Sequence, residues 1–209
     1  LANAYADVGR FDDTRKTLER ALEVARASAG DVSIPVGALS LASAFAASTE
    51  GAWDAADEQF TAVGAIFEKL QGPKSPVVFM ATSGRSGVAF GRGDPERARA
   101  ILEPALEAAR AAGGGQADSV VMAESLLVRI YHALGRGDEI RDLTARLLTR
   151  YEERFASGDR NPDHLWTLAE LRLRAAPGDV EAAKRAVEAA TECARIREAG
   201  QRVDLWEAL

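Results

Sequence analysis

Apolar residues recur along the chain at the three- and four-residue spacing of amphipathic helices. One such face contains Leu18, Leu22 and Ala25, and another contains Leu102 and Leu106. Alanine, leucine, arginine and glutamate dominate the sequence, whereas β-branched residues are few, and this composition favours helix throughout. We therefore predict an all-α fold.

Two interleaved series of glycines divide this helical pattern at one shared interval, which we call the period. The last interval of the second series is slightly longer than the others. Glycine is favoured at a helix C-terminus because it adopts positive φ without a Cβ clash. Each repeat is therefore expected to be a pair of helices with one glycine at each turn. The first series comprises Gly9, Gly51, Gly93 and Gly135, and the second comprises Gly30, Gly72, Gly114 and Gly158.

Helix-start signals follow the glycines. Asp54 and Asp94 stand just after glycines of the first series, where they predict an N-cap or a first-turn acid. Pro76 and Pro162 mark the starts of first helices, a position that tolerates proline. Pro104 falls well inside a predicted helix, which it should bend. The predicted helix pairs are 1–8 with 11–28, 34–48 with 53–71, 76–91 with 94–112, 117–134 with 137–156, and 162–175 with 179–199, and a sixth pair begins near Val203.

Composition restricts the possible partners and compartments. The 209 residues carry a net charge of −6, which argues against bulk attraction to nucleic acid or to an anionic membrane. The sequence has no apolar run of about 18 residues, the length that a membrane-spanning helix needs. Cys193 is the only cysteine, so an internal disulfide is excluded, and a reducing cytoplasm is the predicted location.

Candidate chemistry is sparse. RGD tripeptides occur within Gly91–Asp94 and Gly135–Asp138, and we interpret both as a helix-ending glycine followed by an N-cap aspartate. The two histidines, His132 and His164, lie in different repeats without a nearby cysteine pair, which argues against a zinc site. Cys193 lies on the apolar side of a long helix and is predicted to be a buried structural thiol. We predict no enzyme, no catalytic residue, no cofactor and no metal.

These features resemble the tetratricopeptide repeat (TPR), whose first helix has a leucine, a small residue and an aromatic residue at fixed places. The segment LANAYADVGR at 1–10 supplies this pattern, and LVRIYHALGR at 127–136 repeats it three periods later. The period exceeds the usual length of about 34 residues for this repeat and resembles the kinesin-light-chain type, which is abundant in bacteria. The resemblance covers essentially the whole chain and implies an α-solenoid, a right-handed superhelix of about five helix-turn-helix TPR units. The predicted single array spans 1–209, with units at 1–30, 34–72, 76–114, 117–158 and 162–200 and a further unit starting at 203–209.

Two further observations concern the ends of the chain and one departure from the repeat pattern. The chain opens on LANAYADVGR and closes on LWEAL at the same place in the repeat, so we expect it to be a segment of a larger, bacterial protein. The second helix of the fourth repeat departs most from the pattern, because Ile140 and Thr144 occupy places where the family has small or aromatic residues.

The resemblance also implies a concave groove lined by the first helices, whose ligand-facing places can be carried over to this sequence. The resulting groove is neutral in its first half and basic in its second half, which predicts an acidic peptide or a C-terminal carboxylate as the ligand, because arginine binds carboxylates bidentately. The alternative is that these arginines pair with acidic residues of their own repeats. The predicted groove residues are Asn3, Asp7, Ser43, Arg92, Arg129, His132 and Arg174, with Ala46, Val88 and Leu171 at further places and Met122 and His164 nearer the helix starts.

The sequence thus predicts a protein-interaction scaffold that binds a peptide or helix of a partner protein in this groove. Two alternatives remain. One is a regulatory or substrate-recruiting region of a larger signalling enzyme, such as a bacterial Ser/Thr kinase or protease, which rests on analogy. The other is a structural spacer between flanking domains. Nucleic acid, membrane and small-molecule partners are not expected.

Overall fold

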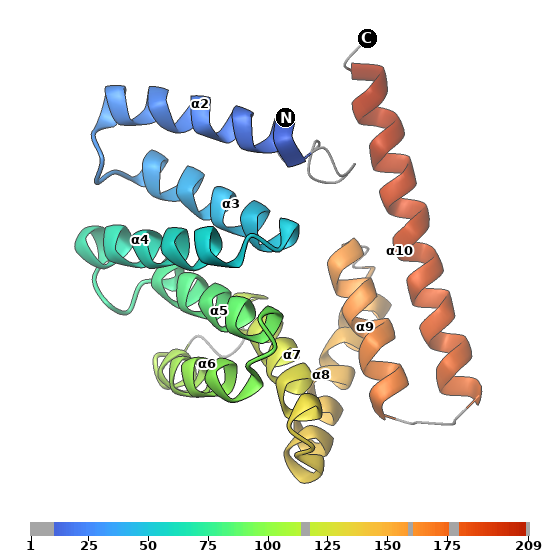
Figure 1. The fold of residues 1–209 in the computed structure, drawn as a ribbon. Helices are drawn as coiled ribbons and strands as arrows, with labels where there is room; N and C mark the ends of the chain where they lie inside the picture. Colours follow the sequence, from blue (N-terminus) through green and yellow to red (C-terminus); the bar gives the residue numbers. More distant parts are fainter. Residues whose placement is uncertain (1–10, 114–117, 159–160, 176–179, 208–209) are drawn as a thin grey trace. The chain divides into compact units, whose positions relative to one another are not determined.

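The computed structural model describes residues 11–113, 118–158, 161–175 and 180–207, which form successive α-helices joined by short turns (Figure 1). This confirms the predicted all-α fold. No helix among the described residues combines the length and apolarity that a bilayer span requires. The chain divides into two compact units, Leu1–Leu134 and Gly135–Leu209.

In the first unit, each helix packs on the next, and α5 also contacts α3 and α7. The helices α3, α5 and α7 are the first members of the predicted pairs, so the first helices form a continuous layer (Figure 1). The bounds are α2 (Phe11–Ala29), α3 (Ile34–Glu50), α4 (Trp53–Gln71), α5 (Pro76–Gly91), α6 (Pro95–Ala111) and α7 (Asp118–Ala133).

The second unit contains α8 (Gly137–Ala156), α9 (Pro162–Ala175) and α10 (Val180–Glu207), each packed on the next. The predicted turn after residue 199 and the new helix near Val203 are wrong, because α10 continues without interruption over 28 residues. Gly200 lies within α10. A glycine costs a helix interior only about 1 kcal/mol relative to alanine, so it weakens a helix without having to end it.

Glycines end the helices as the two series predict. Gly51 is the C-cap of α3 at φ 77°. Its backbone N–H donates to the carbonyl of Ser48, and the N–H of Ala52 donates to the carbonyl of Ala47. Gly9 and Gly114 lie outside the described residues. Gly113, which directly precedes Gly114 in the sequence, has a positive φ. The series members with positive φ are Gly30, Gly51, Gly72, Gly93, Gly135 and Gly158.

The first RGD tripeptide is part of a helix cap. Gly93 has a φ of 80°, and the Asp94 carboxylate accepts a hydrogen bond of 3.0 Å from the backbone N–H of Arg97 at the start of α6. This confirms the interpretation for the first tripeptide. In the second tripeptide the N-cap of α8 is Arg136 and Asp138 lies in the first turn, so the predicted N-cap role of Asp138 is wrong. Pro104 lies inside α6 and is exposed, and the helix continues beyond it to Ala111.

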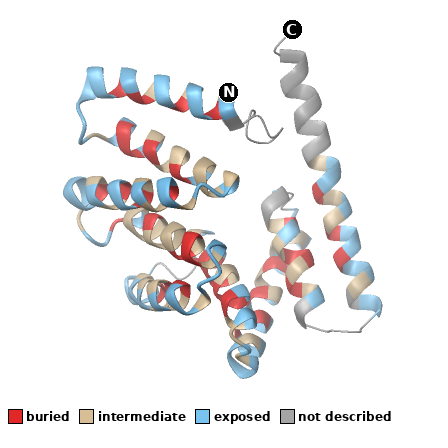
Figure 2. Ribbon diagram, in the orientation of Figure 1, coloured by how far each residue is buried: buried red, intermediate tan, exposed pale blue. Residues whose placement is uncertain are grey.

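Aromatic rings on α4 fill places that glycines leave open on the neighbouring helices. A Cβ atom on Gly84 of α5 would lie 2.4 Å from Cε1 of Phe60, and one on Gly37 of α3 would lie 2.5 Å from Cε2 of Phe67. Both rings are almost fully buried. The buried residues line the helix–helix contacts in each unit (Figure 2). Large-to-small complementarity therefore sets how closely α3, α4 and α5 approach.

Polar contacts also connect two second helices of unit 1, α4 and α6, to the first helix that follows each of them. The Asp57 carboxylate on α4 accepts a hydrogen bond of 2.9 Å from Arg85 on α5. The Glu103 carboxylate on α6 accepts one of 2.8 Å from the Tyr131 hydroxyl on α7. In both pairs the partners are 28 residues apart, so the same helix–helix contact recurs one period later with different side chains.

Candidate functional site

Two first helices of unit 1, α3 and α5, carry far less charge than the second helices. The helices α3 and α5 contain one charged residue each, Glu50 and Arg85, whereas α2, α4 and α6 contain eight, five and six. A helix without a polar face is normally buried on all sides. Exposed positions on these first helices are therefore candidates for contact with a partner.

One face of the first helices forms a row that recurs with the period of the glycine series. Each helix contributes two positions separated by two helical turns, so both lie on the same face. Phe45 is 44% exposed and Met122 is 53% exposed. We call this set the inner row, and it consists of Ala38 and Phe45 on α3, Met80 and Gly87 on α5, and Met122 and Arg129 on α7.

The two α3 residues of the inner row, Ala38 and Phe45, line a groove between α2 and α3 with a volume of about 360 Å³. Its lining is mostly apolar and includes Leu18 of α2 and Ala38, Leu41 and Phe45 of α3. The Phe45 ring packs edge-on against Phe60, with ring centroids 5.1 Å apart and an interplanar angle of 81°. This contact holds the exposed ring in one orientation.

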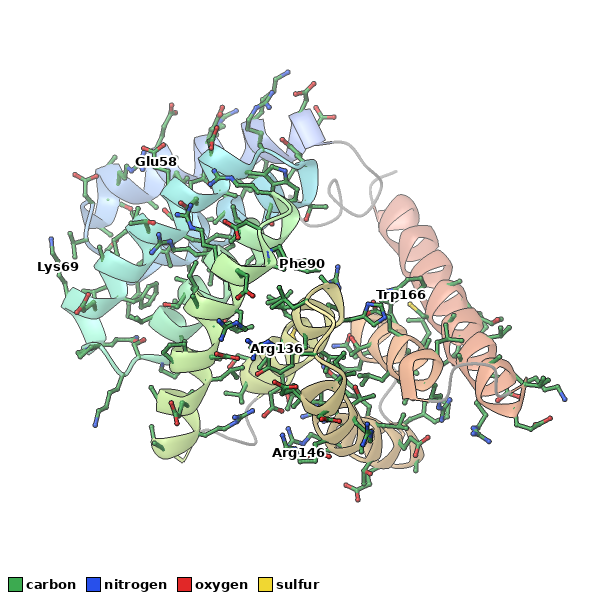
Figure 3. All side chains as sticks on the ribbon, turned by 60° about the horizontal axis from the view of Figure 1, so that its bottom comes forward. Glu58, Lys69, Phe90, Arg136, Arg146 and Trp166 are labelled. Carbon is green, nitrogen blue, oxygen red and sulfur yellow. The ribbon has the colours of Figure 1, made fainter. Side chains whose placement is uncertain are left out.

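Arg129 brings a positive charge to the α7 end of the inner row. Its guanidinium carbon lies 5.4 Å from the centroid of the Phe90 ring, within the range of a cation–π interaction. Figure 3 shows Phe90 at the end of α5, with the exposed Glu58 and Lys69 of α4 on the outside of the unit. Because Arg129 remains exposed, its guanidinium can also reach a carboxylate on a partner.

The other predicted arginine of unit 1 is engaged in an ion pair. Arg92, at the C-terminus of α5, donates a hydrogen bond to the carboxylate of Asp54 in the first turn of α4. The acidic partner therefore comes from the preceding repeat rather than from the arginine's own repeat. Of the two predicted groove arginines in the described part of unit 1, Arg129 belongs to the inner row and Arg92 does not.

Two positions that were expected to line the groove are instead buried in the core. Val88 is 1% exposed and belongs to a cluster with Phe60 and Val63, and Leu171 of the second unit is 2% exposed. These two predictions are wrong. The positions were carried over from the TPR pattern, but in this structure both side chains face the neighbouring helices instead of the groove.

The remaining predicted residues have varied positions. Ser43 is half-buried and lies one period before Arg85, which faces α4. His132 is exposed in the last turn of α7. In the second unit, His164 packs edge-on against Tyr151, with ring centroids 5.7 Å apart. Asn3, Asp7 and the side chain of Arg174 lie outside the described residues.

Sequence reasoning missed Ala38, Phe45 and Met80 as inner-row positions. The available signal was the glycine period combined with the step of two helical turns on each helix. Phe45, rather than Ser43, lies one period before Gly87 and two periods before Arg129.

The described residues also limit the chemistry of the site. They contain no group of three His, Cys, Asp or Glu side chains that could hold a metal ion. The inner row itself contributes apolar surface and one guanidinium. This arrangement suits recognition of another molecule's surface.

Solved structures confirm the class of fold. A crystal structure from Podosopora anserina, of a protein described as a kinesin light chain with nearly identical TPR-like repeats, matches with a TM-score of 0.63 and 18% identity, covering 95% of this chain and 93% of that chain. A second crystal structure of that protein matches with a TM-score of 0.60 and 19% identity, covering 92% and 91%.

The crystal structure of BtubC (BKLC) from P. vanneervenii matches with a TM-score of 0.65 and 19% identity over 95% of this chain and 78% of that chain. No family model and no curated protein matches the sequence. The chain thus has a TPR-like repeat fold that resembles kinesin light chain repeats.

Proposed function

We propose that the chain is a protein-interaction scaffold that binds a peptide or helix of a partner protein along the inner row. The observation that carries this proposal is the exposure of Phe45 and Met122 on a layer of first helices, of which α3 and α5 have almost no charge. Proteins of the TPR-like fold generally serve as interaction scaffolds, which supports the same role.

The chemistry of the inner row defines the partner segment. Ala38, Phe45, Met80 and Met122 offer apolar contacts, and methionine adapts its shape to varied surfaces. The expected segment therefore presents apolar side chains at helical or extended spacing. A carboxylate at one end of this segment would meet Arg129, so an acidic residue is favoured there and not along the whole ligand.

A peptide-display selection against the intact chain tests this proposal. Selected peptides are then measured against Met122→Glu and Ala38→Glu, which introduce a charge at exposed inner-row positions. The matched control is Leu70→Glu, because Leu70 is a 40% exposed apolar residue on the second helix α4. We expect both inner-row variants to weaken binding at least tenfold, which corresponds to about 1.4 kcal/mol, and the control to bind as the unchanged chain does.

Two results would contradict the proposal. Equal binding to all three variants would place the peptide site elsewhere on the chain. If no peptide is enriched above background, the spacer alternative is favoured. The regulatory alternative uses the same surface, and it differs in predicting that the peptide changes the activity of an attached catalytic domain. We further propose a reducing compartment such as the cytoplasm, since the single cysteine, Cys193, is a buried thiol.

A further inference from the structure

The third predicted helix pair, α5 with α6, contains a cavity of about 340 Å³. It lies between the beginning of α5 and the end of α6, beside the first residues of α7. Its lining is mainly apolar and includes Val78, Phe79, Ala109 and Val120. This volume is at the lower end of the range for small-molecule sites.

The preceding pair fills the same place with side chains. In α3 and α4, the Phe67 ring is 3% exposed and occupies the space beside Gly37. In α5 and α6, one period later, Phe79 takes the place of Gly37 and Ala109 takes the place of Phe67. Phe79 is only half-buried, so its ring forms an open wall of the cavity. Around Phe67, the residues Val63, Ile66, Phe67 and Leu70 of α4 correspond to Ala105, Ala108, Ala109 and Ala112 at the end of α6.

Four alanines in place of four large side chains explain why the cavity exists in this pair. Side chains that line an unfilled apolar space lose packing contacts and so lower the stability of the fold. A ligand that fills the cavity would recover part of this loss. The size gives the scale of such a ligand, because a cavity of about 150 Å³ accommodates benzene.

The charge of the residues that line the cavity indicates whether its ligand should be anionic or cationic. Among the described residues that line it, Lys74 is the only charged one. Lys74 is exposed and forms no ion pair with the described residues. The hydroxyl-bearing residues Ser75 and Ser119 also contribute to the lining. The cavity therefore combines an apolar body with a cationic mouth.

We propose that this cavity binds a small amphiphilic carboxylate, with an apolar body of about two fused aromatic rings packed on Phe79 and the alanines and the carboxylate paired with Lys74. This site does not depend on the proposed scaffold function, because none of its lining residues belongs to the inner row.

Calorimetry of the intact chain with 2-naphthoate and with the neutral 2-naphthamide tests the proposal. Ala109→Phe places in α6 the residue that α4 has at Phe67 and should fill the cavity. Ala100→Phe, at an exposed position on the same helix, is its control. Lys74→Ala removes the charge, and Lys69→Ala, also exposed but outside the cavity, is its control. Circular dichroism checks that each variant folds.

We expect the unchanged chain to bind 2-naphthoate at a single site and more tightly than 2-naphthamide. Lys74→Ala should weaken 2-naphthoate about two- to fivefold and leave 2-naphthamide unchanged, as fits an exposed ion pair. Ala109→Phe should abolish binding of both compounds. If Ala109→Phe does not fold, the carboxylate–amide comparison in Lys74→Ala decides the question without a change to the core.

The proposal is overturned if the unchanged chain binds neither compound at millimolar concentration. It is equally overturned if folded Ala109→Phe binds as well as Ala100→Phe does, or if Lys74→Ala weakens both compounds alike.

Discussion

The ring of Phe60 occupies the space that any side chain on Gly84 would need, because a Cβ atom there would lie 2.4 Å from the ring's Cε1 atom. Phe60 is 1% exposed and Gly84 lies in the middle of α5, so neither can move without shifting a helix. The packing of α4 on α5 therefore depends on the absence of one methyl group.

Gly84→Ala is expected to destabilise the first unit by about 1–3 kcal/mol, the usual cost of overpacking. This loss should appear even though alanine is the better helix former by about 1 kcal/mol. Chemical denaturation followed by circular dichroism measures the change. Adding Phe60→Leu should cost less in the Gly84→Ala background than in the unchanged chain, because the two residues are in contact.

Gly64→Ala is the control for this substitution. Gly64 is also a helical glycine, but a Cβ atom there would lie 3.9 Å from Cβ of Ala81, an ordinary contact. This variant should be more stable by about 0.5–1 kcal/mol. Equal stability of Gly84→Ala and the unchanged chain would contradict the packing described above.

Arg172 is expected to be the most sensitive charged residue of the second unit. Its side chain is 11% exposed and connects three helices, because it donates to the Glu152 carboxylate of α8 and to the backbone carbonyl of Arg185 in α10. Arg172→Met keeps the apolar stem but removes both bonds, so a loss of about 1–3 kcal/mol is expected.

Hydrogen exchange read by mass spectrometry should show faster exchange in α8, α9 and α10 of Arg172→Met. Arg195→Met is the control, because Arg195 is 68% exposed and pairs with Glu192 one helical turn away. Unchanged protection in both variants would show that the Arg172 contacts contribute nothing measurable.

Ser86→Ala is expected to destabilise the first unit by about 0.5–1.5 kcal/mol, the net contribution of a typical hydrogen bond. Ser86 is fully buried in α5, and its hydroxyl donates a hydrogen bond of 2.7 Å to the backbone carbonyl of Ala98 in α6. Alanine has no group that can replace this bond between the two helices. Thermal unfolding of the intact chain measures the change.

Ser83→Ala on the same helix is the control for Ser86→Ala. The Ser83 hydroxyl donates to the carbonyl of Phe79 within α5, so it connects no second helix. The higher helix propensity of alanine should offset this loss, and a change within about 0.5 kcal/mol is expected. If Ser86→Ala were as stable as Ser83→Ala, the bond between α5 and α6 would contribute nothing to stability.

The thiol of Cys193 is expected to react slowly with Ellman's reagent in the native chain. It is 2% exposed, and thiol reagents need access as well as thiolate. The rate should rise to that of a free peptide thiol in denaturant. Rapid labelling under native conditions would show that the α9–α10 contact opens readily.

Local signals predicted the helices well, because glycine, proline and aspartate act within a few residues of their own position. Both ends of α4, at Trp53 and Gln71, fall at the predicted residues. The length of α10 could not be predicted in the same way, since Gly200 is compatible either with a C-cap or with a helix interior.

The candidate sites depend on which helix each side chain faces. That orientation depends on helix packing between residues far apart in the sequence, so local sequence signals do not predict it. The pairing of Arg92 with Asp54 spans 38 residues and requires the packed position of α4 on α5. Met122 is exposed and Val120 is buried two positions earlier. Alanines such as Ala105 and Ala109 are ordinary residues of the repeat, so they gave no reason to expect a cavity.

The helix pairs share a period, but their seams are not interchangeable. Phe60 and Gly84 at one seam correspond to Leu102 and Leu126 at the next, and the Asp57–Arg85 pair is followed by Glu103–Tyr131. A chain with these repeats in shuffled order would set the Phe60 ring against the side chain of Leu126. The α4–α5 and α6–α7 contacts therefore each depend on their own matched pair of side chains, and the order of the repeats matters for packing.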